Sequence, residues 1–355
     1  MTVDLDDSEA LAAHDPSDML RAVAALPSHC ALSYVTGREA EGLPSLDGIS
    51  AVTFCGMGGS AVAGDVLRSV FRDRLNVPVD VNRSPELPEY AGPHTLVVAS
   101  SYSGNTSETL SAFREAAARG CRILAVTSGG VLSEECARHG MAVVPVPGGS
   151  APRAALGYLA FGALGALESA GLLPPLEADV EETVAELVGL AGELGPDVPT
   201  GDNAAKRLAG RLGDRTPVVW GAEGIGAVAA MRWKTQMNEN GKIPAWCSSM
   251  SELDHNEVVG WAEGKGAGNV VVALRHEGEP AEVAARFPLS EAIARDAGAE
   301  IEEVVARGRS SLARLLTLIM VGDFTSVYVG LRHGIDPTPV VVIERLKAAL
   351  VGGGG

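Results

Sequence analysis

One pattern occurs twice in this sequence: a short apolar run, a turn rich in glycine, and a helix that starts with Ala-Val-Ala. The first copy covers residues 54–63 and the second covers residues 220–229, with the first glycine shifted by one position. A strand, a glycine turn and a helix form one supersecondary unit, and its recurrence predicts two domains of the same kind in tandem. This repeat constrains the possible folds more than any other feature of the chain.

Apolar runs of strand length alternate with helix-like segments in both halves. The expected strands lie at 51–54, 77–81, 95–100, 122–127 and 142–146, and then at 216–220, 269–275 and 300–304. The expected helices include 61–72, 107–119, 203–212, 227–236 and 310–329. Such alternation is typical of parallel sheets with helices on both faces. We therefore predict an α/β fold with two doubly wound parallel-sheet domains in tandem, and a ligand site between them at the carboxyl ends of the strands.

The chain divides into three predicted regions. Residues 1–48 are expected to form helical segments at 8–14 and 18–25, and they carry no functional motif. Residues 49–175 are expected to form the first domain and residues 176–355 the second. A length of 355 residues is sufficient for two domains that each bury a core.

The strand expected at 95–100 leads into a cluster of hydroxyl side chains, which we call the serine turn (residues 101–106). Three hydroxyls of this turn and one that follows it surround Gly104: Ser101, Ser103, Thr106 and Ser107. Backbone N–H groups of a turn and the dipole of the following helix both attract an anion. The sequence therefore predicts a phosphate site here, and an ordinary Ser/Thr-rich helix cap is the simpler alternative.

The first glycine turn (residues 56–60) has two interpretations. Residues 56–61 fit the pattern G-x-G-x-x-A, and Asp80 follows near the end of the next strand, as in NAD-binding domains. A dinucleotide domain has no need of the serine turn, however, whereas a phosphate held by two strand ends would use it together with Gly59 and Ser60. We expect the phosphate site and keep an NAD-dependent oxidoreductase as the weaker alternative. The second glycine turn (residues 221–226) contains Glu223, which would repel a phosphate, so we expect it only to pack.

The charge and the cysteines indicate which partners and compartments to expect. A formal net charge of −17 argues against binding to nucleic acid or to an anionic membrane surface. The acidic N-terminal segment does not resemble a signal peptide, and the apolar run at 154–167 is too short to span a bilayer. Five cysteines without a CxxC pair indicate reduced thiols in a cytoplasmic protein. Cys136 and His139 have no second ligand pair, so no metal site is expected.

Two polar segments of the second half contain candidate acid–base residues. Glu239 stands between two asparagines at the end of an apolar helix, and His255 lies in an acidic, amide-rich segment. A carboxylate and an imidazole brought into one pocket can transfer protons near neutral pH. A solvated helix-end residue is the simpler interpretation of Glu239, although a Glu is mildly unfavourable at a helix C-terminus. His255 alone is more typical of a structural residue.

Five segments together carry a resemblance to a known family: Gly58-Gly59-Ser60, residues 101–106, residues 151–158, Asn238-Glu239-Asn240 and His255-Asn256-Glu257. In this order they resemble the bifunctional phosphoglucose/phosphomannose isomerases of the sugar isomerase (SIS) superfamily. The similarity extends to residues 336–339 and 343–347 of the last segment. It implies two SIS domains and a homodimeric aldose–ketose isomerase without metal or cofactor. Its substrates would be glucose 6-phosphate and, with it, mannose 6-phosphate.

The resemblance also implies a role for each site residue. The 6-phosphate would be bound by Gly59, Ser60, Ser101, Ser103 and Thr106. Glu239 would move the proton between C2 and C1 of the sugar, and Arg153 would stabilise the negative charge of the enediolate. His255 would open the sugar ring from the partner subunit, and Lys347 would assist ring opening.

Each of these cations also has a structural interpretation. Arg153 opens an Ala/Gly-rich helix and is consistent with an exposed first-turn residue, while Lys347 near a helix C-terminus complements the helix dipole. The family has Asn where Asp254 precedes His255, and a carboxylate facing the imidazole would raise the pKa of His255. The main alternative function is a non-catalytic SIS protein that binds a phosphosugar and regulates another process. Such a protein would not need all four proposed catalytic residues.

Overall fold

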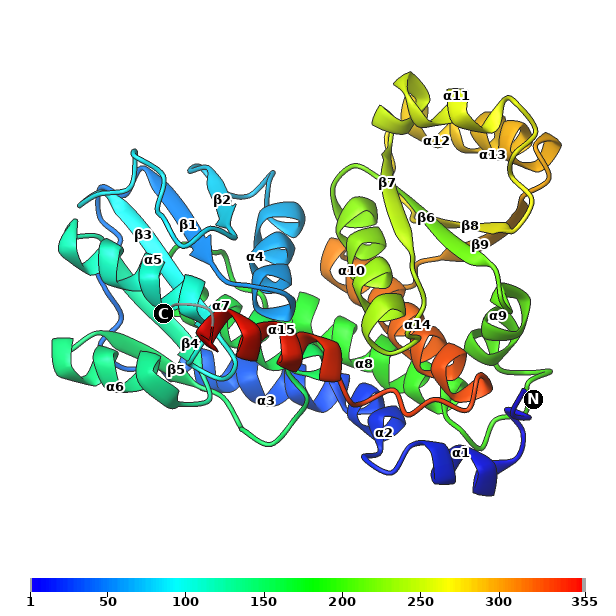
Figure 1. Ribbon diagram of the computed structural model, residues 1–355. Helices are drawn as coiled ribbons and strands as arrows, with labels where there is room; N and C mark the ends of the chain where they lie inside the picture. Colours follow the sequence, from blue (N-terminus) through cyan, green and yellow to red (C-terminus); the bar gives the residue numbers. More distant parts are fainter. Residues whose placement is uncertain (1, 353–355) are drawn as a thin grey trace.

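The computed structural model describes residues 2–352, apart from the side chains of residues 347, 348 and 350–352. Its strands form two separate parallel sheets, one in each half of the chain (Figure 1). The predicted fold class, two parallel-sheet α/β domains in tandem, is therefore confirmed. The expected strand positions agree closely with the observed ones, because each expected strand is a short apolar run that the sheet buries.

The first sheet has five strands in the order β2-β1-β3-β4-β5. They are β1 (Ala51–Cys55), β2 (Val79–Asn82), β3 (Thr95–Ser101), β4 (Arg122–Thr127) and β5 (Ala142–Pro145). Every residue of β1 and β3 is buried, because helices cover both faces of the sheet. One face packs on α5 (Ser107–Ala118) and α6 (Gly130–His139), and the other on α4 (Gly59–Val70) and α7 (Leu156–Ser169).

The second sheet repeats this arrangement with four strands in the order β7-β6-β8-β9. They are β6 (Thr216–Ala222), β7 (Trp246–Met250), β8 (Asn269–Arg275) and β9 (Glu300–Val305). One face packs on α9 (Ala204–Leu212), α10 (Ile225–Glu239) and α14 (Ser311–Arg332). The other face is covered by the short helices α11 (Glu257–Trp261), α12 (Ala281–Ala284) and α13 (Phe287–Asp296). The sequence analysis missed β7, because this edge strand has an exposed tryptophan and two serines instead of an apolar run.

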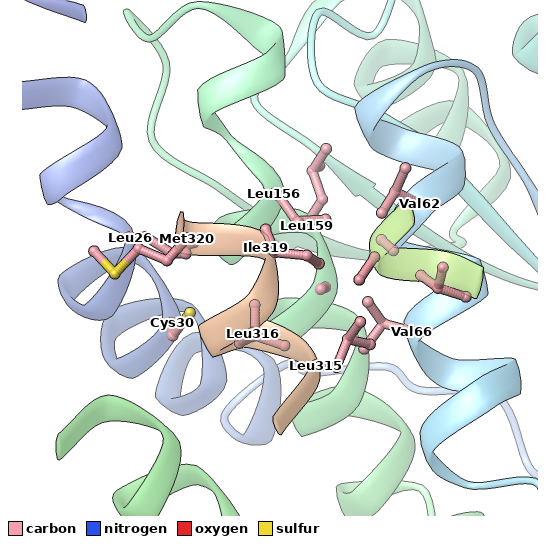
Figure 2. Packing of buried hydrophobic residues seen from close by; sticks show 14 of the residues in the cluster. Leu26, Cys30, Val62, Val66, Leu156, Leu159, Leu315, Leu316, Ile319 and Met320 are labelled. Carbon is pink, nitrogen blue, oxygen red and sulfur yellow. The ribbon is translucent and has the colours of Figure 1, made fainter. Parts of the chain in front are cut away.

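A single buried apolar cluster runs through both domains. Figure 2 shows Val62 and Val66 of α4 and Leu156 of α7 close to Leu315 and Ile319 of α14. Helix α14 is long and apolar enough to cross a membrane, but 94% of its most apolar window is buried inside the protein, as in a core helix. Helix α8 (Glu177–Leu194) also packs against α14. The two domains therefore share a core, which places α4 of the first domain against α10 of the second.

The N-terminal region contains one helix more than expected. Helices α1 (Ser8–His14) and α2 (Met19–Ala24) match the prediction, whereas α3 (Leu26–Arg38) was missed. Helix α3 packs very closely on α7. A Cβ atom on Gly37 of α3 would lie only 2.2 Å from the carbonyl oxygen of Gly162 of α7, so the contact requires glycine at position 37. The backbone N–H of Val3 donates to the carbonyl of Arg332 at 2.8 Å. The N-terminal region thus contacts both domains. The last helix is α15 (Val341–Gly352).

Candidate active site

The first glycine turn and the serine turn lie side by side. Strands β1 and β3 are paired neighbours, with Cys55 opposite Ala99, so their carboxyl ends bring the two turns together. The backbone N–H of Tyr102 donates to the Ser60 hydroxyl at 3.4 Å. Gly58 precedes α4 at a φ of 52°, which favours glycine. The N–H groups of Ser60 and Ala61 donate to the carbonyls of Met57 and Gly58, which leaves the N–H of Gly59 for a ligand at the strand ends. The arrangement offers hydroxyl and backbone donors to one anion.

Hydrogen bonds within the serine turn hold its side chains in place. The Ser101 and Thr106 hydroxyls lie 2.9 Å apart, and the N–H of Gly104 donates to the Ser101 hydroxyl at 3.1 Å. The N–H of Asn105 donates to the Ser103 hydroxyl, which is exposed. A Cβ atom on Gly104 would lie 1.8 Å from the carbonyl oxygen of Gly129, so the turn requires glycine at this position. These features fit the predicted phosphate site.

Gly59 lies close to the segment that carries Arg153. A Cβ atom on Gly59 would lie 3.3 Å from the carbonyl oxygen of Pro152 and 3.8 Å from the Cα atom of Arg153. A short 3-10 helix, η1 (Pro152–Ala154), forms this segment between β5 and α7. The small size of Gly59 therefore lets the glycine turn and Arg153 approach each other.

Arg153 points from the first domain toward Glu239 at the end of α10. Its Nη1 atom lies 3.9 Å from Oε2 of Glu239, an ion-pair distance without a hydrogen bond. Arg153 is 5% exposed and Glu239 is 33% exposed, so the carboxylate remains open to a ligand. Burial lowers the pKa of Arg153, and the Glu239 carboxylate acts in the opposite direction. The interpretation of Arg153 as an exposed first-turn residue is wrong, because the arginine is enclosed between the two domains.

A buried ion pair supports Arg153 from behind. Arg232 of α10 binds Asp323 of α14 in a bidentate manner, with N–O distances of 3.0 and 2.8 Å. The Nη2 atom of Arg232 also donates to the carbonyl oxygen of Arg153 at 2.5 Å. Asn240 accepts a hydrogen bond from Nε of Arg153 and donates to Ser326 of α14. Both the backbone and the side chain of Arg153 are thus anchored to the second domain.

Residues 336–339, which we call the proline segment, cross the same region before α15. Nη2 of Arg153 donates to the carbonyl oxygens of Pro337 and Thr338 at 2.8 and 2.9 Å. Nζ of Lys242 donates to the carbonyl oxygens of Pro337 and Pro339. The proline segment therefore lies beside Glu239 and leads into the helix that carries Lys347. The side chain of Lys347 lies outside the described residues.

His255 is not brought to Glu239 within one chain. It is exposed at the end of η2 (Glu252–His255), two residues before α11. Figure 1 places α11 at the far edge of the second domain, well away from the end of α10. The neighbouring Asp254 carboxylate accepts hydrogen bonds from Arg286 at 3.0 Å and from Ser290 at 2.6 Å. The Asp254 carboxylate is therefore bound to α13 and to the residue that precedes this helix.

Sequence reasoning missed four residues of this region. Arg232, Asp323 and Lys242 were not singled out, and Asn240 entered only as part of a motif. A signal was present for Arg232, since an arginine within the apolar segment 227–237 must find a buried partner. No comparable signal exists for Lys242, because two of its three hydrogen-bond acceptors are backbone carbonyls almost one hundred residues away in sequence.

Comparison with known families agrees with the two-domain architecture. Residues 48–148 match the SIS domain, and residues 201–350 match the family described as the bacterial phospho-glucose isomerase C-terminal SIS domain. The crystal structure of a glucose-6-phosphate isomerase like protein from Thermus thermophilus has the same fold. It aligns with a TM-score of 0.61 at 20% identity, covering 98% of this chain and 99% of that chain. The fold and the two strand-end turns thus define a tandem SIS-domain protein.

Two relatives identify the family more closely. The bifunctional phosphoglucose/phosphomannose isomerase of Caldicellulosiruptor bescii is 39% identical over 334 residues, which are 94% of this chain and 98% of that protein. The protein of the same name from Aquifex aeolicus is 35% identical over 84% of this chain and 90% of its own length. This chain belongs to the bifunctional phosphoglucose/phosphomannose isomerase family.

Proposed function

We propose that this protein is an isomerase that interconverts glucose 6-phosphate and mannose 6-phosphate with fructose 6-phosphate. One observation carries the proposal within the structure: the Glu239 carboxylate lies 3.9 Å from the buried guanidinium of Arg153, an arginine whose backbone lies against the first glycine turn. Membership of the isomerase family supports the same reaction. A proton-transferring carboxylate, a cation and a phosphate site are the parts that this chemistry requires.

In the proposed reaction, the 6-phosphate is bound by Gly59, Ser60, Ser101, Ser103 and Thr106. Glu239 takes the proton from C2 of the open-chain aldose and returns it to C1, while a hydroxyl proton passes from O2 to O1. Arg153 stabilises the negative charge that develops on the cis-enediolate. Glucose 6-phosphate and mannose 6-phosphate differ only at C2, so both give the same enediol and the same ketose.

This scheme needs neither a metal ion nor a cofactor, because the electron pairs are redistributed within the sugar. We therefore expect full activity in the presence of EDTA, with fructose 6-phosphate formed from each aldose in separate assays. Loss of activity on chelation, restored by a divalent ion, would contradict metal independence. No turnover of either sugar by the folded protein would favour the alternative of a phosphosugar-binding regulator. Binding of a nicotinamide cofactor would favour the oxidoreductase.

Ring opening is proposed to involve Lys347 and a His255 supplied by the partner subunit of a homodimer. The exposure of His255 and the separation of α11 from the C-terminal end of α10 (Figure 1) support a contribution between subunits. Complementation tests this directly. Glu239→Gln and His255→Ala proteins, each inactive, are mixed under conditions that exchange subunits. Mixed dimers contain one intact site, so about a quarter of wild-type activity should return after random exchange. Absence of recovery despite verified exchange would contradict the shared site.

We also propose that the protein is located in the cytoplasm. All five cysteines are free thiols, and three of them, Cys30, Cys55 and Cys136, are buried. Free thiols are typical of proteins kept in a reducing compartment. Nothing in the proposed reaction involves nucleic acid or a membrane.

A further inference from the structure

Lys242 is held in a backbone conformation that side-chain-bearing residues rarely adopt. Its φ is 56°, in the left-handed region that normally favours glycine. Among the described residues, only Asp18 shares a positive φ without being glycine. Such conformations persist where the surrounding contacts stabilise them, often at functional sites. The contacts of Lys242 therefore require explanation.

The ammonium group of Lys242 connects the end of α10 with the proline segment. Nζ donates to the carbonyl oxygen of Glu239 at 2.5 Å, to that of Pro337 at 2.9 Å and to that of Pro339 at 2.5 Å. All three of its donors are thus used by backbone carbonyls. Burial lowers the pKa of Lys242, and the nearby Arg153 acts in the same direction. A lysine that only completed a helix C-terminus would need just the first of these three bonds.

The proline segment receives a second set of bonds from Arg153, at the carbonyls of Pro337 and Thr338. The carbonyls of three successive residues are therefore held by two cations that flank Glu239. Helix α15 begins two residues later, and several of its apolar side chains are exposed, with Val342 at 78% and Leu346 at 61%. Because the described side chains of α15, those of residues 341–346 and 349, are all exposed, we expect the position of this helix to depend on the proline segment.

We propose that Lys242 is a positioning residue that holds the proline segment, and through it α15 and Lys347, in place relative to Glu239. The inference rests on the proposed isomerase function for its catalytic consequence. Its structural part does not depend on that function. Lys242 uses all of its donors on backbone, so its effect on the reaction passes through other groups.

Two substitutions at this position separate positioning from simple stability. Lys242→Met removes the three hydrogen bonds and keeps the left-handed backbone, whereas Lys242→Gly removes the bonds and relieves the conformational cost. We expect both variants to lose about 10- to 100-fold in kcat, as for a misplaced active-site group, although their unfolding midpoints should differ. Lys242→Arg should recover part of the activity. Catalytic losses that simply followed the two unfolding midpoints would overturn the proposal.

A double-mutant cycle tests whether Lys242 acts through Lys347. In a Lys347→Ala background, the further loss from Lys242→Gly should nearly vanish, because the group that it positions is gone. Full additivity of the two losses would contradict the proposal. Lys206 is a suitable control, since it is buried and donates to the carbonyl of Pro196 in a region remote from Glu239. Lys206→Met should lower the unfolding midpoint and leave kcat unchanged.

Hydrogen exchange gives a readout that does not require turnover. We expect the amides of residues 338 and 340–346 to exchange at least several-fold faster in Lys242→Gly than in the wild-type protein, while the exchange of α14 stays unchanged. Unchanged exchange of these amides would overturn the proposal even if activity fell. If wild-type protein turned over neither sugar while Lys242→Gly still showed the faster exchange, the proposed function would fail and the structural inference would stand.

Discussion

The two domains share a topology and differ in what their strand ends carry. In the first domain, β3 is followed by the serine turn, whose hydroxyls surround Gly104. In the second, the equivalent strand β8 is followed by His276, Glu277, Gly278 and Glu279. The Glu279 carboxylate there accepts hydrogen bonds from Arg275 and from the N–H of His276. The same strand end thus offers neutral donors in one domain and carboxylates in the other, and only the first suits a phosphate.

The two glycine turns also differ in their side chains, although their backbones are similar. Gly58 and Gly224 both precede a helix with positive φ and with ψ at −128°. The side chains differ: the first turn contains Ser60, whereas the second contains Glu223 and no hydroxyl. The two turns therefore share a backbone arrangement and differ in chemistry through a few side chains.

The second domain contributes in another way, through the far end of its helix. Glu239 lies at the last position of α10, and Arg232 lies two turns earlier on the same helix. The candidate site thus combines phosphate donors from the N-terminal end of α4 with an acid from the C-terminal end of α10.

The largest effect is expected from Glu239→Gln. Loss of the proposed general base should lower kcat by about 10²- to 10⁴-fold, because an amide cannot accept the proton from C2. Binding of fructose 6-phosphate, measured by titration calorimetry, should change little, since the phosphate donors remain. Glu223→Gln in the second glycine turn serves as the matched control and should leave kcat unchanged. Substantial activity in the Glu239 variant would exclude this residue as the base.

A large loss of stability is expected from Asp323→Asn or Arg232→Gln. Removing one partner leaves the other charge buried, which should lower the free energy of unfolding by about 3–5 kcal/mol. The exposed pair of Arg307 and Glu193 provides the contrast. There, Glu193→Gln should cost at most about 1 kcal/mol. Urea denaturation of both variants measures the difference, and equal losses would contradict the assigned role of the buried pair.

A smaller effect is expected from the serine turn. The double substitution Ser101→Ala and Thr106→Val removes two hydroxyls of the proposed phosphate site. Because one of these hydroxyls donates to the other, at least one bond to the phosphate is lost. A bond to a charged group contributes ~1.5–3 kcal/mol, so KM should rise about 10-fold or more. Glu277→Gln, on the corresponding turn of the second domain, should leave KM unchanged. An increase of KM in the Glu277 variant would indicate that the second turn also contacts the substrate.

The smallest effect is expected from Asp254→Asn. Because the Asp254 carboxylate is bound by Arg286 and Ser290, its replacement by a neutral amide should change the reaction little. The pH profile of kcat should therefore keep its shape, with less than about a 2-fold change in rate. A marked acid shift of the profile would show that Asp254 does act on the imidazole.

Much of the fold followed from the sequence because strands and turns are local features. The apolar runs of β4 and β8 and the repeated glycine turn were sufficient to predict two parallel sheets. Strand β7 was not predicted, because an edge strand with one face toward solvent needs no apolar run. Helix α3 escaped because its burial depends on a close fit to α7 at Gly37, which only the packed structure reveals.

Some features of the candidate site could likewise be predicted from the sequence, and others could not. The hydroxyls of the serine turn, Gly59 and the isolated Glu239 are visible in the sequence, because each lies directly at the end of a strand or helix. The burial of Arg153, its approach to Glu239 and the support from Arg232 arise only when α4, α10 and α14 pack together. Sequence alone thus determined which chemical groups are present and on which turns. Tertiary structure decided their pairing, because ion pairs and hydrogen bonds between distant segments depend on distances that only packing sets.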